Sequence, residues 1–126
     1  MQKDFSESTL SGKHMIIDLK GVCNVKLMND VKAIQELIEA ICETYHYHIL
    51  GKNCHCFVPV GITLVYMLSE SHISLHTFPE RNCIAIDIYT CKEMDSLREY
   101  EEIYDWLVTT FDALRERPLI LDRRLS

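Results

Sequence analysis

Apolar residues recur in this chain with two different periods, and these periods predict where its strands and helices lie. Over residues 71–78, the apolar residues Ile73 and Leu75 alternate with His72 and His76, which is the period of a β-strand. Such a strand has one apolar face and one face that carries imidazoles and a hydroxyl. A face of this kind fills a core poorly, so we expect it to line a functional site.

Two segments carry apolar residues at the spacing of an amphipathic helix. The first follows Asn29 or Asp30, either of which can cap a helix N-terminus. The second starts near Asp95 or Ser96, where Ser96 and Glu99 form a capping-box pattern. We expect their buried faces to consist of Val31, Ile34, Leu37, Ile38, Ile41 and Tyr45 in the first helix and of Tyr100, Ile103, Tyr104, Leu107, Val108 and Phe111 in the second.

The other apolar runs predict further strands, after a polar and frayed tail at the N-terminus. We expect a turn near residues 51–53 to break the second strand, and we expect the most apolar one, 62–68, to be central and buried on both faces. Pro118 indicates an edge position for the last strand. The expected tail covers residues 1–11, and the strands cover residues 14–20, 46–57, 62–68, 83–91 and 118–121.

This order of elements predicts a single α+β domain over residues 1–126, a two-layer sandwich of a mainly antiparallel sheet with two helices on one face. The isoleucines of the 83–91 strand would face the helices. The opposite face is too apolar for water and too polar for a closed core, so a second copy of the sheet could cover it. Its apolar and aromatic residues are Val65, Met67, Phe78 and Tyr89.

The composition is that of an ordinary globular domain, with 48% hydrophobic and 25% charged residues. The net charge of −6 argues against a nucleic-acid partner. We expect neither a signal peptide nor a membrane-spanning segment, because no apolar run is long enough. We expect the six cysteines to be reduced thiols in the cytoplasm. Cys83 and Cys91 would lie roughly 26 Å apart on one strand, too far to pair.

The segment Cys54-His55-Cys56 contains residue types that bind metals. On a strand, however, the two cysteines point to one face and the histidine to the other. Because no second cluster stands at ligand spacing, we expect no metal site.

Five short motifs resemble those of one enzyme family. They are Gly12-Lys13-His14, Phe57-x-Pro59-x-Gly61-Ile62-Thr63, Ser69-Glu70-Ser71-His72, His76-Thr77-Phe78-Pro79-Glu80 and Ile86-Asp87-Ile88-Tyr89-Thr90-Cys91. In these motifs the chain resembles the short prokaryotic-type S-adenosylmethionine decarboxylase proenzymes. The resemblance implies a homodimer with its two sheets face to face, helices outside in a four-layer αββα arrangement, and sites near the interface.

Decarboxylation of an α-amino acid requires an electron sink, such as a carbonyl group that forms a Schiff base with the amine. With four glycines and no glycine-rich loop, the chain shows no phosphate cradle for pyridoxal phosphate. The resemblance implies instead a pyruvoyl group made from Ser71. Its Oγ would attack the carbonyl of Glu70, and the chain would cleave itself into residues 1–70 and 71–126.

The resemblance also implies roles for other residues. Thr63 would assist processing, at a position where the family often has serine, and His76 would accept the Cα proton of Ser71. Cys91 would donate the proton that replaces carbon dioxide, since a thiol gives up its proton readily near neutral pH. Phe57 and Phe78 would flank the substrate's adenine and sulfonium, and Glu80 would hold the ribose hydroxyls. Relatives often have tryptophan at position 78.

The chain departs from the family pattern at Asn82-Cys83-Ile84-Ala85 and at Lys92, next to the expected site. These changes leave the processing residues in place but leave the substrate open between S-adenosylmethionine and a basic amino acid such as arginine or ornithine. A further alternative is that the protein is an uncleaved, regulatory homologue without catalytic activity. The retention of Ser71, His76 and Cys91 argues against it. An α+β binding module with accidental motif matches is the last alternative.

Overall fold

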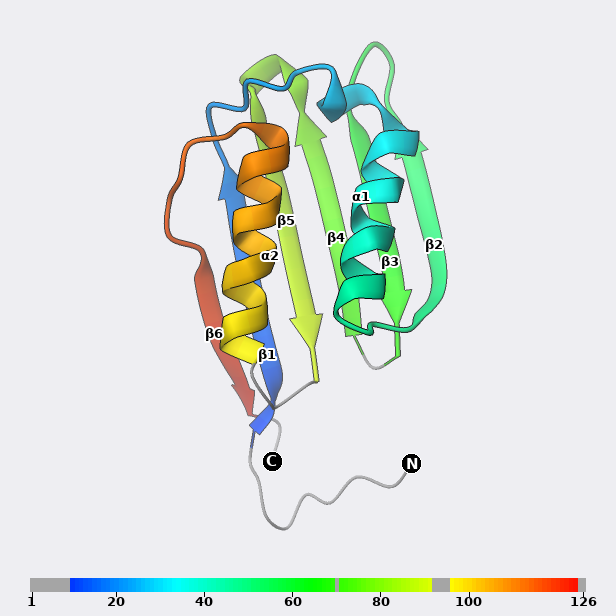
Figure 1. Ribbon diagram of the computed structural model, residues 1–126. Helices are drawn as coiled ribbons and strands as arrows, with labels where there is room; N and C mark the ends of the chain where they lie inside the picture. The colour runs from blue at the N-terminus through cyan, green and yellow to red at the C-terminus, as the bar shows by residue number, and fades with distance from the viewer. Residues whose placement is uncertain (1–9, 70, 92–95, 125–126) are drawn as a thin grey trace.

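The computed structural model describes residues 10–69, 71–91 and 96–124 (Figure 1). Within these residues, six strands form one antiparallel sheet, and two α-helices cover one of its faces (Figure 1). The strands are β1 (Leu10–Leu19), β2 (Ile49–Cys56), β3 (Ile62–Leu68), β4 (Ser71–Phe78), β5 (Cys83–Thr90) and β6 (Leu119–Arg124). The helices are α1 (Val31–Thr44) and α2 (Ser96–Phe111), with 3₁₀ turns η1 (Leu27–Asn29) and η2 (Pro79–Arg81).

The strand order across the sheet is β2-β3-β4-β5-β1-β6, so the N-terminal strand lies between β5 and β6. All neighbouring strands pair antiparallel. This arrangement confirms the predicted two-layer α+β fold, and it confirms the edge position of the last strand.

Both helices bury the faces that their periodicity predicted. Asp30 caps α1, where its side chain accepts a hydrogen bond of 3.1 Å from the backbone N–H of Ala33. The predicted stripe of α2 is buried along its whole length. In the stripe of the first helix only Val31 and Tyr45, the C-cap residue that follows α1, are partly exposed. Tyr100 of α2 reaches the sheet, and its hydroxyl donates to the carbonyl oxygen of Lys13 at 2.5 Å.

Strands β4 and β5 have one apolar and one polar face, as the alternation predicted. The residues that face the helices are buried and form the core under them: Ile73, Leu75 and Thr77 in β4, and Ile84, Ile86 and Ile88 in β5. The residues on the opposite face, called here the outer face, are only partly buried, and Phe78 is exposed. In β4 and β5 they pair as His72 with Tyr89, Ser74 with Asp87, His76 with Ala85 and Phe78 with Cys83.

Several details of the strand prediction were wrong. Strand β2 begins at Ile49 rather than at residue 46, and β6 runs to Arg124 rather than ending at residue 121. Strand β1 begins at Leu10 rather than at residue 14. The expected turn near residues 51–53 is absent, because β2 continues from 49 to 56 with only a shift in register between Ile49 and Gly51.

Strand β3 is not a central strand buried on both faces. It lies next to the edge strand β2, and Val65 and Met67 on its outer face are 38% and 56% exposed. A continuous apolar run suggested burial on both sides, but the helices of this chain cover only one side.

The predicted capping box of α2 lies outside the described residues, which omit Asp95 and the side chain of Ser96. Neither helix of the described chain combines the length and apolar composition that crossing a membrane requires.

Candidate active site

Ser71 and Cys91 meet at one end of the sheet. Ser71 is the first residue of β4 and Cys91 follows the last residue of β5, so antiparallel pairing brings the two together. The backbone N–H of Cys91 donates to Ser71 Oγ at 3.3 Å, and the Cys91 thiol donates to Tyr89 Oη at 3.6 Å. Ser71 and Cys91 are both partly buried. The predicted cleavage partner Glu70 lies outside the described residues.

Gly12 allows β1 to pass close to this end of β5. Its φ of +130° is unfavourable for residues with a side chain. A Cβ at this position would overlap the carbonyl oxygen of Thr90 and would lie 3.0 Å from Cys91 Cα. The backbone around Cys91 is therefore placed partly by a position that only glycine can occupy without strain.

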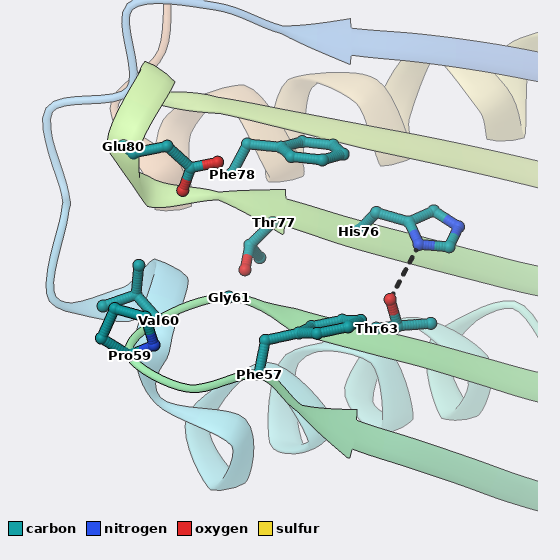
Figure 2. A pocket seen from close by; sticks show the side chains of 9 residues that line it. All are labelled: Phe57, Pro59, Val60, Gly61, Thr63, His76, Thr77, Phe78 and Glu80. Carbon is teal, nitrogen blue, oxygen red and sulfur yellow. Dashed lines mark hydrogen bonds between the residues drawn. The ribbon is translucent and has the colours of Figure 1, made fainter.

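Thr63 and His76 form a second group. They face each other across β3 and β4, and Thr63 Oγ1 lies 3.0 Å from His76 Nδ1, within hydrogen-bond distance (Figure 2). This contact fixes the orientation of the imidazole ring and leaves its Nε2 for another partner.

A cavity of about 570 Å³ adjoins the Thr63–His76 pair. Figure 2 shows Phe57, just after β2, and Phe78, from the end of β4, on opposite sides of it, with Glu80 beside Phe78. The full lining consists of Phe57, Pro59, Val60, Gly61, Thr63, His76, Thr77, Phe78 and Glu80. An apolar cavity with two aromatic rings and one carboxylate suits an aromatic, positively charged ligand that also carries hydroxyl groups.

Local hydrogen bonds hold the walls of the cavity. The backbone N–H of Phe57 donates to the carbonyl oxygen of Gly61 at 2.8 Å and closes the β2–β3 hairpin. Buried Thr77 accepts a hydrogen bond of 2.9 Å from the N–H of Ile62, which ties β3 to β4. The ring of His55 packs edge-on against that of Phe57 at 4.6 Å, a supporting contact that the sequence analysis missed.

The two groups of predicted site residues lie at opposite ends of the sheet. Figure 1 shows the start of β4 and the end of β5 at one end, and the β2–β3 hairpin and η2 at the other. Ser71 and His76 are five residues apart on β4, which is about 16 Å along a strand. Within one protomer, therefore, the structure brings Ser71 to Cys91 but does not bring either of them to His76 or to the cavity.

A polar cluster on the outer face lies between the two groups. Asp87 accepts hydrogen bonds from Ser74 Oγ at 2.5 Å and from His14 Nε2 at 3.2 Å, and His72 Nε2 lies 3.5 Å from the same carboxylate. Partial burial raises the pKa of Asp87, but the hydrogen bonds from Ser74 and His14 and the charge of His72 outweigh this effect. The net result is a lowered pKa, so the carboxylate stays ionised.

The ligand atoms of His14, His72 and Asp87 lie within 4.8 Å of one another, a spacing that could hold a metal ion. However, Arg123 Nη1 lies 3.4 Å from His14 Nδ1, and an arginine can only donate. Nδ1 then accepts, so His14 Nε2 carries the proton that it donates to Asp87. The nitrogen that a metal would need is thus already used, and the contacts favour a hydrogen-bonded cluster over a metal site.

Sequence reasoning missed this cluster, although His14 and His72 stand in two of the motifs. Its members come from β1, β4, β5 and β6, and their meeting depends on a strand order that periodicity does not reveal. The available signal was that His72, Ser74 and Asp87 share the strand face that carries His76.

Comparisons with known proteins agree with the resemblance found in the motifs. The family model described as "S-adenosylmethionine decarboxylase" matches residues 13–124. The "S-adenosylmethionine decarboxylase proenzyme 2" of Bacillus cereus is 40% identical over 85 residues, which cover 68% of each chain. The "S-adenosylmethionine decarboxylase proenzyme" of Thermodesulfovibrio yellowstonii is 34% identical over 82 residues, 65% of this chain and 60% of that protein.

A solved structure matches nearly the whole fold. The crystal structure of the adenosylmethionine decarboxylase from Aquifex aeolicus superposes with a TM-score of 0.80 and 27% identity, over 94% of this chain and 95% of that one. The resemblance found in the motifs is therefore confirmed over the length of the domain, and the chain belongs to the S-adenosylmethionine decarboxylase family.

Proposed function

We propose that this protein is a self-processing, pyruvoyl-dependent decarboxylase that converts S-adenosylmethionine to its decarboxylated form, the aminopropyl donor of polyamine synthesis. The relatives named as proenzymes and decarboxylases support this function. The observation that carries it is the contact between Ser71 Oγ and the backbone N–H of Cys91, which sets the proposed cofactor precursor beside the proposed proton donor.

The surroundings of Ser71 fit a pyruvoyl group. Ser71 pairs with Leu68 in β3, and the next residue, His72, pairs with Tyr89 in β5, so the sheet would hold the start of a downstream fragment in place. Such a group supplies a ketone that condenses with the substrate amine and takes up the electron pair left when carbon dioxide departs. The remaining tasks fall to the side chains around it.

Processing would begin when Ser71 Oγ attacks the carbonyl carbon of Glu70. The C–N bond breaks and an ester forms; removal of the Cα proton of Ser71 then breaks the Cβ–Oγ bond. Oγ leaves as part of the Glu70 carboxylate. Because the N–H of Cys91 already donates to Oγ, it would stabilise the negative charge that develops there. Addition of water and loss of ammonia complete the ketone, and the products are residues 1–70 and 71–126.

His76 is the proposed acceptor of the Cα proton, yet it lies about 16 Å from Ser71 in the same protomer. We therefore infer a homodimer in which two outer faces pack with their strands antiparallel, giving four layers in the order αββα. Each His76 would then lie beside the Ser71 of the other copy. The exposed apolar residues of the outer face support this packing: Val65, Met67, Leu119 and Leu121.

In this dimer, the cavity of one copy would open toward Ser71 and Cys91 of the other. Phe57 and Phe78 would stack on adenine and attract the sulfonium, and the Glu80 carboxylate would accept hydrogen bonds from the ribose hydroxyls. The cavity volume of about 570 Å³ lies in the range of small-molecule sites. Cys91 would then protonate the substrate carbon. Since this role needs a free thiol, we expect the protein in a reducing compartment, the cytoplasm.

The first test is the mass of the purified protein under denaturing conditions. We expect two fragments that divide between Glu70 and Ser71, the downstream one lighter by about the mass of ammonia than a fragment with an N-terminal serine, because a ketone replaces the amine. The Ser71→Ala variant should stay whole. A wild-type chain that also stays whole after long incubation would point to the uncleaved regulatory homologue.

The second test identifies the substrate. Carbon dioxide release is measured with carboxyl-labelled S-adenosylmethionine, arginine and ornithine in separate reactions. We expect release from S-adenosylmethionine alone. Release only from a basic amino acid would support the pyruvoyl chemistry but would show that S-adenosylmethionine is not the substrate.

A further inference from the structure

We infer that Tyr89 is a positioning residue for the proton donor: its hydroxyl holds the Cys91 thiol before proton transfer and stabilises the thiolate afterwards. The inference rests on the proposed function. Tyr89 and Cys91 are two residues apart and point to the same side of the sheet, and the thiol donates to Tyr89 Oη at 3.6 Å. This contact gives the S–H bond a defined direction before the reaction.

The ring of Tyr89 is held by side chains from three other strands. The guanidinium of Arg123, from β6, lies 5.2 Å from the ring centroid, within the range of a cation–π contact. The rings of His14 and His72 lie 5.8 Å and 6.0 Å away. The Asp87 carboxylate contacts both histidines, so the outer-face cluster surrounds the phenol and fixes the position of its hydroxyl.

A phenol can serve both states of the thiol, because its oxygen accepts and its O–H donates. When Cys91 protonates the substrate carbon, the S–H bond breaks, a C–H bond forms and the electron pair stays on sulfur. The Tyr89 hydroxyl can then rotate and donate to the thiolate, an interaction with a charged group that is stronger than the neutral hydrogen bond it replaces. Water restores the proton to sulfur. Phenylalanine could do neither.

A delayed or misdirected proton has a chemical signature. If the proton instead reaches the carbon derived from Ser71, hydrolysis leaves alanine at the start of the downstream fragment and releases the substrate carbon skeleton as an aldehyde. The ketone is consumed and the protein is inactivated. The ratio of alanine-starting fragments to carbon dioxide released therefore reports how well the Cys91 proton is delivered, separately from the overall rate.

The test compares Tyr89→Phe with Tyr47→Phe. The hydroxyl of Tyr47 donates to Glu99 of α2 at 3.1 Å, on the helix side of the sheet, so this control removes a hydroxyl outside the site. Both variants should cleave into two fragments. Tyr89→Phe should inactivate roughly tenfold more often per turnover, the scale of a lost hydrogen bond to a charged group. Tyr47→Phe should match the wild type. Equal inactivation in all three proteins would overturn the inference.

A second measurement needs no cofactor. In the uncleaved Ser71→Ala background, the rate at which iodoacetamide alkylates Cys91 is followed by peptide mass. Without the Tyr89 hydroxyl the attacking thiolate loses its hydrogen-bond donor, so alkylation should slow about threefold. An unchanged rate would show that the hydroxyl does not act on the thiol.

These experiments separate the inference from the proposed function. If the wild-type protein neither cleaves nor releases carbon dioxide, the proposed function fails, while the alkylation rates still report the Tyr89–Cys91 contact. In the Cys91→Ala background, Tyr89→Phe should have no further effect on inactivation. An additive effect there would mean that Tyr89 acts through another group.

Discussion

Two inactive variants should restore activity when they are made together, if the active site is shared between two copies of the chain. Ser71→Ala removes the serine that becomes the ketone, and His76→Ala removes the imidazole proposed to accept its Cα proton. Each variant alone forms dimers in which both copies lack the same residue, so neither contains a complete site. About 16 Å separates the two residues on β4, so one copy cannot supply both of them to one site. A mixed dimer pairs the intact Ser71 of one chain with the intact His76 of the other and so contains one complete site.

The expected yield follows from the symmetry of a dimer. With equal expression and random pairing, about half of the dimers are mixed, and each mixed dimer has one complete site of two. The unpurified mixture should therefore give roughly a quarter of the wild-type activity and the isolated mixed dimer roughly half, and only the chain that carries His76→Ala should be cleaved. The assay is co-expression with two different affinity tags, purification through both tags, fragment masses and carbon dioxide release.

A matched control uses two variants from the same end of the sheet. Ser71→Ala with Cys91→Ala cannot rebuild a site in any pairing, because both residues come from one copy in the proposed dimer. Activity in the first pair, and no more than the residual activity of Cys91→Ala in the second, would support the shared site. The reasoning would be refuted if the first pair were as inactive as its members although the mixed dimer had been isolated.

Three further variants and one control variant test individual residues. Cys91→Ala should still yield both fragments, but carbon dioxide release should fall about a hundredfold, as for loss of a positioned acid; full activity would contradict its role as proton donor. Gly12→Ala should lower the free energy of unfolding in urea by about 2 kcal/mol through backbone strain. Gly51→Ala, where an added Cβ meets nothing closer than 3.8 Å, should change it by less than about 1 kcal/mol. Because the pKa of Asp87 is lowered in the fold, its ionised form adds stability above about pH 4, which is lost as the pH falls through the folded value. Urea titrations between about pH 2 and 7 should therefore show less acid destabilisation in Asp87→Asn than in the wild type, and equal pH dependence would refute this account.

The layers of the fold could be predicted because each depends on local periodicity. The alternation in β4 and the helical stripe that ends at Phe111 each occupy one continuous segment, and both agree with the structure. The burial of β3 was harder to predict. An apolar residue such as Met67 gives the same sequence pattern whether a helix of the same chain or a second protein molecule covers it. The single chain leaves it 56% exposed.

The motifs supplied a set of candidate site residues, but they did not reveal how these residues are arranged in the fold. The motifs supplied Ser71, His76 and Cys91, yet their spacing along the chain gives no sign that one protomer separates His76 from the other two. The polar cluster around Asp87 on the outer face was not predicted, for a related reason. Arg123 reaches it only because β1 lies between β5 and β6, and pairing of strands distant in sequence leaves no periodic signal.

The strand order also decides what becomes of the two pieces after the proposed cleavage. Residues 1–70 contain β1, β2, β3 and α1, while residues 71–126 contain β4, β5, β6 and α2. Since β1 is inserted between β5 and β6, and β4 continues the sheet from β3, the two pieces are interleaved in one sheet and share one core.

Cleavage would therefore change the molecularity of folding rather than the folded structure. The intact chain closes its sheet as a single polymer, with only a modest entropic cost for each loop. Once it is cut and then unfolded, the same sheet must assemble from two separate molecules, so recovery depends on protein concentration. The protein would consequently fold once, as the uncleaved precursor. If the cleaved protein later unfolded, it would refold with difficulty.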